Sequence, residues 1–381
     1  MIYMNHSATS WPKPECVVRA YREALEAVPE GQYRSSGAVP ETDTMDSCRK
    51  VLGSLLGIAD TGRVFFSSGA TESANLLAGG LLARTGAGGN ILVTAAEHNA
   101  VLRTVYNQPE FRGRVKVIPC DGRGRVTADA LRKTAGQEPV CAVYINHCSN
   151  VTGAVQPVRE LTETAHALGA LAVLDLSQSA GCVPVSVDGT GADAVFFTGH
   201  KALLGVPGTG GYYVRRDVPF VPVKFGGTGR NSARLDYSEP PYEFEPGTQN
   251  LPGIAALKAG AEFVLKEGVS EISRRETGLV RRMIVEMRRM DGVRVYDAGE
   301  NAETGPLFSF TVDGLEPRDV AYILNSSGII VRVGLHCAPL IHEYIGSGSR
   351  GTVRVSVGYC TTERETDEFL DVMRGIAASR R

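Results

Sequence analysis

Between about residue 50 and residue 215, the chain alternates short apolar runs with stretches of helical periodicity. TESANLLAGGLLA and VRELTETAHALG are two stretches with the helical pattern. Apolar strands that are separated by helices pack into a mainly parallel sheet that is covered on both faces. The sequence therefore predicts an α/β fold with a seven-stranded sheet, whose strands lie at 63–68, 90–96, 114–120, 140–147, 171–177, 193–199 and 210–216.

The rest of the chain has the pattern of a loop followed by a smaller α+β unit. Gly, Pro and polar residues, interrupted by aromatic residues, predict a long structured loop at 217–253. A helix is predicted after residue 254, followed by strands at 307–312, 329–333 and 352–359 and by helices in PRDVAYILNSSG and TERETDEFLDVMRGIAA. We therefore expect an N-terminal segment at 1–15, a large domain at 16–253 whose first helix can join the smaller one, and a small domain at 254–381.

The charge of the chain limits its partners. Acidic and basic residues nearly cancel, to a formal net charge of −2, and no block of like charge stands out. Such a chain attracts neither nucleic acid nor an anionic membrane, so a small molecule or a protein is the expected substrate. The opening MIYMNHSATSWPKPE lacks the pattern of a signal peptide, and no apolar run approaches the length of a membrane span. The expected location is the cytoplasm.

Eight cysteines are scattered along the chain without a Cys-x-x-Cys pair. This spacing argues against a zinc site and against a disulfide framework, and most of these cysteines are expected to be buried apolar residues. Cys337 differs, because its neighbours in RVGLHCAPLIH, Gly334 and Pro339, are loop formers. From its position alone it is either a nucleophile or a structural residue.

Ligands of parallel α/β sheets bind at the carboxyl ends of the strands. In SSGATES, a strand passes through Gly69 into a helix that starts near Thr71, and this helix N-terminus either holds a phosphate or is an ordinary N-cap. His98 follows a strand in TAAEHNA, Asp175 ends one in LDLSQS, and Lys201 follows one in FFTGHKALLG. A buried carboxylate needs a cationic or hydrogen-bonding partner, and a Schiff base with an aldehyde neutralises a buried lysine.

Each of these features has a structural explanation when it is taken alone. Together they supply a phosphate cradle, an aromatic ring for stacking, an acid for a pyridine nitrogen and a lysine for an aldehyde, which are the parts that bind pyridoxal 5'-phosphate. A dinucleotide site is disfavoured, because no candidate strand is followed by G-x-G-x-x-G. The predicted cofactor is pyridoxal 5'-phosphate, and no metal is expected.

From about residue 50 to its C-terminus, the chain resembles the class V aminotransferase group of fold-type I pyridoxal-phosphate enzymes, in particular the cysteine desulfurase and selenocysteine lyase branch. The resemblance implies that Lys201 bonds the cofactor, His98 stacks on its ring and Asp175 pairs with the ring nitrogen. It also implies that the cofactor phosphate is contacted by Ala70, Thr71, Thr198 and His200. The ring hydroxyl would be contacted by Gln178 and by Asn150, in SNVTGAVQP, and Asn150 would also contact the substrate carboxylate. Thr248, in EPGTQN, would contact the phosphate of a neighbouring subunit. A homodimer with shared active sites follows from the last contact.

Two further residues connect the resemblance with a reaction. Arg354, in GTVRVSVGY, resembles the arginine that grips the substrate carboxylate, although its alternation with valines is by itself typical of a solvent-facing side chain. Cys337 lies in a loop similar to the R-x-G-x-H-C loop of the desulfurases, where the cysteine attacks the substrate sulfur and His336 or a cationic pocket favours its thiolate. The expected function is a cysteine desulfurase that converts L-cysteine to L-alanine and leaves a persulfide on Cys337 for a sulfur-acceptor protein. His98 is expected to transfer a proton to or from the sulfur.

Three segments differ from the pattern of the family. MNHSATS replaces the usual Leu-Asp-Asn-Ala-Ala-Thr-Thr, GQYRSSG lacks an Asn-Pro step, and Cys360 and Thr361 replace an aromatic residue and an asparagine. Several of these segments line the substrate entrance in the family, so a selenocysteine lyase, another β-lyase, an aminotransferase or a non-catalytic binding protein stay alternatives. Intact Lys201, Asp175 and His98 argue against the non-catalytic protein, and Cys337 argues against an aminotransferase.

Overall fold

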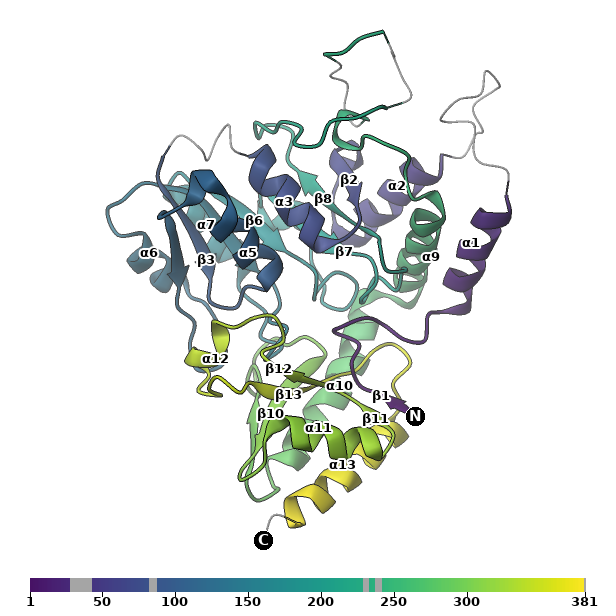
Figure 1. Cartoon of the computed structure of the whole chain (residues 1–381), viewed down its shortest axis with the longest axis vertical. Helices are drawn as coiled ribbons and strands as arrows, with labels where there is room; N and C mark the ends of the chain where they lie inside the picture. Colours follow the sequence, from purple (N-terminus) through teal and green to yellow (C-terminus); the bar gives the residue numbers. More distant parts are fainter. Residues whose placement is uncertain (28–42, 82–87, 229–232, 237–241, 380–381) are drawn as a thin grey trace.

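The computed structural model describes residues 1–27, 43–81, 88–228, 233–236 and 242–379. The segment GQYRSSG lies outside these residues. The described part consists of a large unit around a seven-stranded sheet and a smaller unit around a four-stranded sheet, which lie one above the other in Figure 1. No helix in the described ranges is long and apolar enough to span a membrane.

The seven-stranded sheet has the order β2-β8-β7-β6-β5-β3-β4. Strand β8 runs antiparallel to both of its neighbours, and the other neighbouring pairs are parallel. The strands are β2 (Val64–Ser67), β3 (Asn90–Thr94), β4 (Val115–Ile118), β5 (Val140–Asn146), β6 (Leu171–Asp175), β7 (Ala194–Thr198) and β8 (Gly210–Val214). Each predicted run contains one of them, so the predicted α/β fold with a mainly parallel sheet is confirmed.

Apolar side chains on both faces of this sheet explain why its strands are continuously apolar. Phe66 and Phe197 belong to one buried cluster, and the adjacent Phe65 and Phe196 belong to another on the opposite face. Helices α3 (Ala70–Gly80) and α5 (Asn99–Asn107) cover one face, while α2 (Thr44–Leu56), α6 (Ala128–Ala135), α7 (Val158–Ala167) and α9 (Leu251–Glu267) cover the other. Shorter helical turns are Thr61–Arg63, Pro109–Phe111, α8 (Val187–Thr190) and Tyr242–Phe244.

The smaller unit is built on an antiparallel sheet of order β12-β13-β10-β9 with its own apolar cluster. Its strands are β9 (Val293–Tyr296), β10 (Leu307–Val312), β12 (Arg332–Gly334) and β13 (Thr352–Ser356). Its helices are α10 (Val269–Met287), α11 (Pro317–Ser326), α12 (Ile341–Tyr344) and α13 (Glu363–Ala378). The N-terminal strand β1 (Ile2–Tyr3) pairs in parallel with β11 (Ile329–Ile330), which joins the first residues of the chain to this unit (Figure 1).

Three details of the smaller unit differ from the sequence prediction. Two helices follow residue 250 in place of one, because Gly268, with φ of +82°, separates α9 from α10. The predicted strand at 329–333 is divided into β11 and β12, which belong to different sheets. Strand β9 was not predicted from the sequence.

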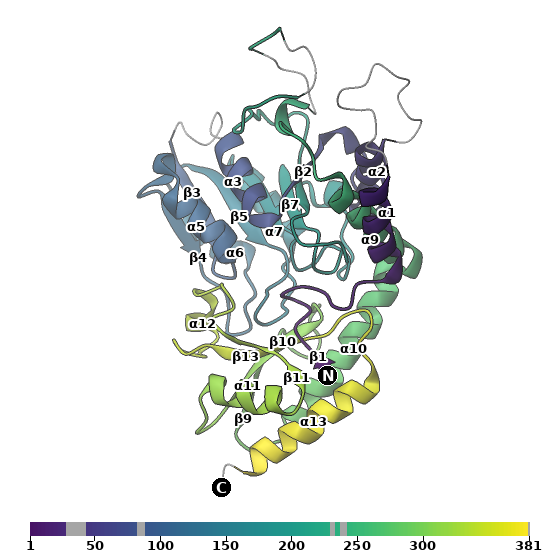
Figure 2. The same ribbon diagram turned by 45° about the vertical axis from the view of Figure 1, so that its right-hand side comes forward.

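Helix α9 begins before the predicted domain boundary at 253 and packs against α2 and against α1 (Glu15–Glu26). Helix α10 then continues down the smaller unit, as Figure 2 shows. The division into 1–15, 16–253 and 254–381 therefore stays a prediction.

Candidate active site

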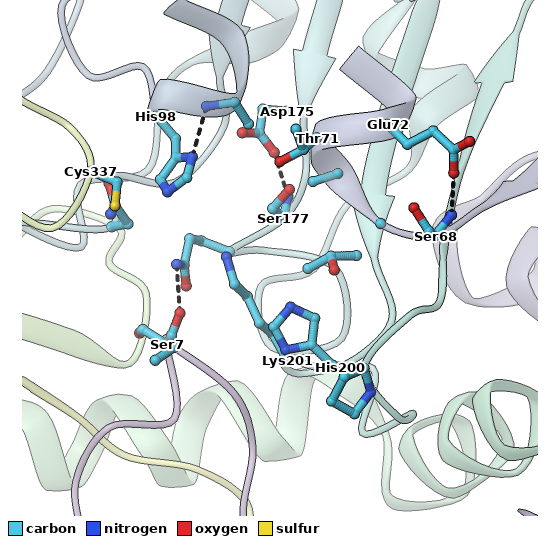
Figure 3. Close-up of a pocket in the computed structure, with 18 of the residues that line it drawn as sticks. Ser7, Ser68, Thr71, Glu72, His98, Asp175, Ser177, His200, Lys201 and Cys337 are labelled. Atoms are coloured by element: carbon cyan, nitrogen blue, oxygen red, sulfur yellow. Dashed lines mark hydrogen bonds between the residues drawn. The ribbon is translucent and has the colours of Figure 1, made fainter. Parts of the chain in front are cut away.

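A cavity of about 340 Å³ lies at the carboxyl ends of the parallel strands (Figure 3). The large unit, the N-terminal segment and the loop after β12 all contribute to its wall. The predicted site residues that line it are Ala70, Thr71, His98, Asn150, Asp175, Gln178, Thr198, His200, Lys201 and Cys337. Thr248 and Arg354 do not line it.

One end of the cavity is formed by the N-terminus of α3. Gly69 precedes this helix with φ of +145°, a conformation that side chains disfavour, and a Cβ there would lie 3.6 Å from Thr198 Oγ1. The Ser68 N–H donates to Glu72 at 2.7 Å, while Ala70 and Thr71 open the first turn. The backbone N–H groups at this end have the arrangement that binds phosphate.

Asp175 and Lys201 approach the cavity from the ends of neighbouring strands. Asp175 ends β6, is 3% exposed, and accepts a 2.7 Å hydrogen bond from the Ser177 N–H (Figure 3). Burial raises the pKa of Asp175, and the charge of Lys201 opposes this shift. Lys201 follows β7, and burial lowers its pKa to about 8. The pair thus brings a buried acid and a buried amine to the same cavity.

His98 is the N-cap of α5. Its Nδ1 accepts a 3.0 Å hydrogen bond from the Ala100 N–H, which fixes the ring at the edge of the cavity (Figure 3). Burial lowers the pKa of His98 to about 4, and the nearby charge of Lys201 adds to this effect. The ring is therefore neutral near neutral pH, and its remaining nitrogen is free of the cap bond.

The loop that carries Cys337 is fixed by backbone contacts to the large unit. His336 and Cys337 both have positive φ, +52° and +59°, which is uncommon for residues other than glycine. Asn150 Nδ2 donates to the His336 carbonyl at 2.7 Å. The Asn99 N–H donates to the Cys337 carbonyl at 2.6 Å, next to His98. The loop therefore presents Cys337 beside His98, as Figure 3 shows.

Arg332, and not His336, is the cation that contacts the sulfur. Arg332 Nη2 donates to Cys337 Sγ at 3.1 Å. The His336 ring instead pairs with Thr352 Oγ1 at 2.9 Å, and burial holds its pKa well below the usual value. Of the two neighbours that the sequence left open, the structure thus places the cationic Arg332, and not His336, against the sulfur.

Arg354 is completely buried, which excludes the alternative of a solvent-facing side chain that its alternation with valines favoured when taken alone. Its Nη1 donates to the Asn150 carbonyl at 3.0 Å, and its Nη2 donates to Asn5 Oδ1 at 3.2 Å. The Nε atom has no hydrogen-bond partner among the described residues. Arg354 therefore lies behind Asn150, and its charge contributes to the lowered pKa of Lys201 and of His98.

Thr248 is exposed and lies outside the main cavity. It borders a separate depression together with Ser68 and Glu72, which also line the main cavity near the start of α3. The loop that carries Thr248 is anchored by Glu245, which pairs with buried Arg49 and accepts a 2.7 Å hydrogen bond from the Phe66 N–H. Thr248 is thus held at the surface, outside the end of the cavity where α3 begins.

Sequence reasoning did not assign several residues of the site. Arg332 lies in RVGLHC, and its position five residues before Cys337 is the sequence feature that indicates a contact with the sulfur. Ser7 and Ser177 line the cavity, and the Ser7 carbonyl accepts a 3.0 Å hydrogen bond from Gln178 Nε2. Glu97, next to His98, is fully buried, and burial together with Asp175 raises its pKa to about 8.

The polar atoms of the cavity fit pyridoxal phosphate. Asp175 has no salt-bridge partner within the described ranges, so a protonated pyridine nitrogen would complete its interactions. Four buried polar atoms of the cavity wall have no partner among the described residues: Asn146 Oδ1, Asn150 Oδ1, Ser177 Oγ and His200 Nδ1. Together with Lys201 and the start of α3, they offer donors and acceptors for an aldehyde, a ring hydroxyl and a phosphate.

Comparison with known proteins decides the family. A model of the class-V aminotransferases matches residues 2–369. The chain belongs to the class-V aminotransferase family. It is 31% identical to a probable cysteine desulfurase of Xylella fastidiosa (strain 9a5c), over 97% of this chain and 89% of that protein. It is 32% identical to probable cysteine desulfurase 2 of Mycobacterium leprae (strain TN), over 97% of this chain and 90% of that protein.

Solved structures agree with this assignment. The apo structure of a cysteine desulfurase from Thermococcus onnurineus NA1 has a TM-score of 0.90 and 31% identity, and the match covers 99% of this chain and 95% of that chain. A cysteine desulfurase of Escherichia coli has the same fold, with a TM-score of 0.87, 24% identity and coverage of 99% and 94%. The resemblance found in the sequence is therefore confirmed, and so is the fold-type I architecture. The class-V family depends on pyridoxal phosphate, which confirms the predicted cofactor.

Proposed function

We propose that this class-V family member is a cysteine desulfurase that takes sulfur from L-cysteine, leaves L-alanine and carries the sulfur as a persulfide on Cys337. The observation that supports this most directly is that Cys337 Sγ, held at 3.1 Å by Arg332, lines the same cavity as Lys201. An aminotransferase has no use for a thiol at this place. The cysteine desulfurase names of the relatives point to the same reaction.

The residues of the large unit would hold the cofactor. Ala70, Thr71, Thr198 and His200 are proposed to surround the phosphate, together with the N-terminus of α3. Asp175 would keep the ring nitrogen protonated, Gln178 and Asn150 would contact the ring hydroxyl, and the neutral His98 ring would cover the face of the ring. When bound, pyridoxal phosphate withdraws electrons from the substrate α-carbon.

Lys201 and Arg354 are proposed to handle the substrate. The lowered pKa of Lys201 keeps a neutral amine accessible near neutral pH, and this amine would accept the proton of the substrate α-carbon. Asn150 and Arg354 are proposed to bind the substrate carboxylate, and Arg354, whose guanidinium lies behind Asn150 in this structure, would have to turn toward the cavity to reach it. The loop backbone at 336–337 is linked to Asn150, so carboxylate binding and sulfur transfer are adjacent in space.

The sulfur step needs a nucleophile and a proton. Cys337 Sγ would attack the substrate sulfur, so that an S–S bond forms while the C–S bond breaks and its electron pair stays with the carbon fragment. The Arg332 guanidinium would stabilise negative charge on Sγ through its hydrogen bond. His98, neutral and beside Cys337, is placed to move a proton at the sulfur.

A homodimer is proposed on two observations besides the resemblance. Thr248 is exposed beside the proposed phosphate-binding end. A second subunit that packs here would bring Thr248 of one subunit close to the phosphate site of the other. The nearby segment also exposes apolar side chains, including Phe225, which is 83% exposed, Val221 and Val223. A sulfur-acceptor protein and a cytoplasmic location stay predictions from the sequence, and no residue of the described chain identifies the acceptor.

The function is tested by incubating the pyridoxal-phosphate-loaded enzyme with L-cysteine and a thiol reductant. Equal amounts of alanine and sulfide are expected, and mass spectrometry without the reductant should find one extra sulfur on the peptide that contains Cys337. A parallel reaction with selenocysteine distinguishes a cysteine desulfurase from a selenocysteine lyase, because a selenocysteine lyase would strongly prefer selenocysteine over cysteine. Pyruvate and ammonia in place of alanine would instead assign a β-lyase.

A further inference from the structure

A second, smaller cavity of about 30 Å³ lies behind Lys201. Lys201, Ser7 and Gln178 belong to the walls of both cavities, so they separate the main site from this rear cavity. Most of the rear wall is apolar and includes Val264, Ile272 and Val357. A volume of this size holds one or two water molecules where polar partners are present.

The rear cavity contains a carboxyl group that the proposed function does not use. Glu276 lies on α10, is 4% exposed, and lines the cavity. No hydrogen bond or ion pair of its carboxyl is found with any residue in the described part of the chain, and the charge nearest to it in effect is that of Arg275. A buried carboxyl without a partner is costly, because it loses its hydration without compensation. Water in the adjacent cavity could form hydrogen bonds with this carboxyl and so offset its lost hydration.

Other polar and titratable groups face the same space. His6 also lines the cavity, and its Nδ1 has no partner among the described residues, while its ring packs against Gly358. The other titratable side chains that line the rear cavity, besides Lys201, are Cys182 and Tyr359. Arg275 lies near Glu276 and donates a 2.9 Å hydrogen bond to the Tyr359 carbonyl. Burial raises the pKa of Glu276 to about 8, although the charge of Arg275 opposes this shift, and burial lowers the pKa of His6 to about 4. Both groups are therefore neutral near neutral pH.

The rear cavity also has a polar connection toward the protein surface. Ser10 is part of its wall, and Lys13 Nζ donates to Ser10 Oγ at 2.7 Å. Lys13 is half-buried, and it also donates to the His200 carbonyl at 2.9 Å, next to Lys201. Ser10 belongs to the N-terminal segment MNHSATS, which differs from the family pattern. Ser10 Oγ itself donates to the His200 carbonyl at 3.1 Å, so this segment connects Lys13 with the cavity when the Ser10 hydroxyl turns toward the cavity.

We propose that water in the rear cavity links Glu276 to Lys201, and that this link exchanges protons between the Lys201 amine and bulk solvent through Ser10 and Lys13. The link serves the Lys201 amine after it has accepted a proton in the main site. Lys201 Nζ gives a proton to the adjacent water while the far end of the water chain releases a proton to bulk solvent. Transfer in the reverse direction returns a proton to Lys201 Nζ. Glu276 in its neutral form accepts from one water through its carbonyl oxygen and donates through its hydroxyl, so it connects the chain without a net change of charge. Glu276 thus relays protons within the water chain, and it reaches Lys201 only through this water.

The inference rests on the proposed role of Lys201 in the loaded enzyme, and the experiment separates the two. The loaded enzyme is incubated with L-alanine, the proposed product, in D₂O, and exchange of the α-hydrogen is followed by NMR. Wild type and Cys337→Ser should both exchange, since Cys337 is not needed for this step. If neither exchanges, the proposed function fails together with the route that depends on it.

Variants of Glu276 test the route itself. Glu276→Leu removes the polar end of the chain and fills the cavity, and should slow exchange at least about tenfold while cofactor binding is retained. Glu276→Gln keeps shape and hydrogen bonding but cannot relay a proton, and should slow exchange to a similar extent. Glu271→Gln, on the exposed part of the same helix, is the matched control. Wild-type exchange in Glu276→Gln would overturn the proposal even where the leucine variant fails to fold.

Two further measurements do not depend on turnover by the Glu276 variants. Infrared difference spectra of the apoprotein, wild type minus Glu276→Gln, should contain the carbonyl band of a protonated carboxylic acid at neutral pH, and this band should shift promptly in D₂O. An absent band, or a band that does not shift, would show a charged or dry carboxyl and overturn the proposal. Ser10→Ala should slow α-hydrogen exchange as well, and exchange at the wild-type rate would contradict the path through Lys13.

Discussion

The backbone N–H of Asn99 donates a 2.6 Å hydrogen bond to the backbone carbonyl of Cys337. This bond joins the first turn of α5, which His98 caps, to the loop that follows β12 in the smaller unit. Because both groups are backbone atoms, the connection survives substitution of either side chain. The position of the sulfur relative to His98 is therefore set by the loop, whose two consecutive positive φ angles turn the chain toward α5.

The first prediction concerns Arg332. If its guanidinium stabilises negative charge on Cys337 Sγ, Arg332→Gln should slow alkylation of Cys337 by iodoacetamide about tenfold in the apoprotein at neutral pH. Arg332→Lys should restore part of the rate, because it returns the charge without the fixed geometry. Peptide mapping separates Cys337 from the partly exposed Cys16 and Cys360. An unchanged rate in both variants would remove Arg332 from this role.

A second prediction concerns the covalent attachment of the cofactor. The purified protein is expected to be yellow, and borohydride reduction followed by peptide mapping should place the label on Lys201. Lys201→Ala should stay unlabelled after reconstitution with pyridoxal phosphate, while Lys13→Ala, which alters the adjacent half-buried lysine, should still be labelled. Label on a different lysine of the wild type would contradict the assignment of the whole site.

Glu97 provides a prediction for pH. Its pKa is raised from the usual value near 4.5 to about 8, first by burial and then by Asp175, so the folded protein keeps this proton at a higher pH than the unfolded chain does. Its contribution to stability is therefore fully present below about pH 4.5 and is lost as the pH rises to about 8, at roughly 1.4 kcal/mol per pH unit. Relative to Glu97→Gln, the apoprotein should lose about 2 kcal/mol of unfolding free energy between pH 5.5 and pH 7.5. Urea unfolding at both pH values measures this difference.

The control for Glu97 is Glu26→Gln, which changes an exposed glutamate at the end of α1. This variant should follow the wild type at both pH values. A constant difference between the wild type and Glu97→Gln across the range would mean that Glu97 titrates alike in the folded and unfolded states, contrary to its burial.

The large sheet could be predicted because burial on both faces makes its strands continuously apolar. Strand β9 could not, since VRVY alternates apolar residues with Arg294 and is half-exposed over only four residues. The break between α9 and α10 depends on Gly268, which in sequence is one glycine in a helical pattern. The separation of β11 from β12 arises from the pairing of β11 with the N-terminus, a contact between distant parts of the chain.

Several residues of the candidate site could be predicted because they follow strands whose carboxyl ends meet at one edge of the sheet. The alternation of Arg354 with valines is the sequence pattern of a solvent-facing side chain. Arg354 is buried because β13 packs between β10 and β12. Glu97 and Glu276 were missed for the same reason: next to polar residues in TAAEHNA and SRRETGL, a buried glutamate has the same sequence pattern as an exposed one. Their burial depends on elements that are remote in the chain.

The fourth prediction concerns assembly. If the exposed apolar segment beside Thr248 packs against a second subunit, Phe225→Asp should raise the dimer dissociation constant by at least about tenfold. Cofactor affinity should fall with it, since a shared phosphate contact would be lost. Tyr322→Asp, which changes a side chain that is 73% exposed on α11, is the matched control. Sedimentation that finds a wild-type monomer with full cofactor affinity at low concentration would exclude shared sites.

The last prediction returns to the sulfur. Cys337→Ser should keep the loop in place, because the bonds from Asn99 and Asn150 use backbone carbonyls of the loop, so cofactor binding and α-hydrogen exchange of alanine should stay close to wild type. Sulfide release from cysteine should nevertheless collapse by at least about a hundredfold, since a serine hydroxyl is a poor nucleophile without an activating base. Selenium release from selenocysteine should fall less, because a selenol leaves more easily than a thiol. Assaying both substrates on this one variant separates the roles, and unchanged sulfide release would make Cys337 a structural residue of the loop.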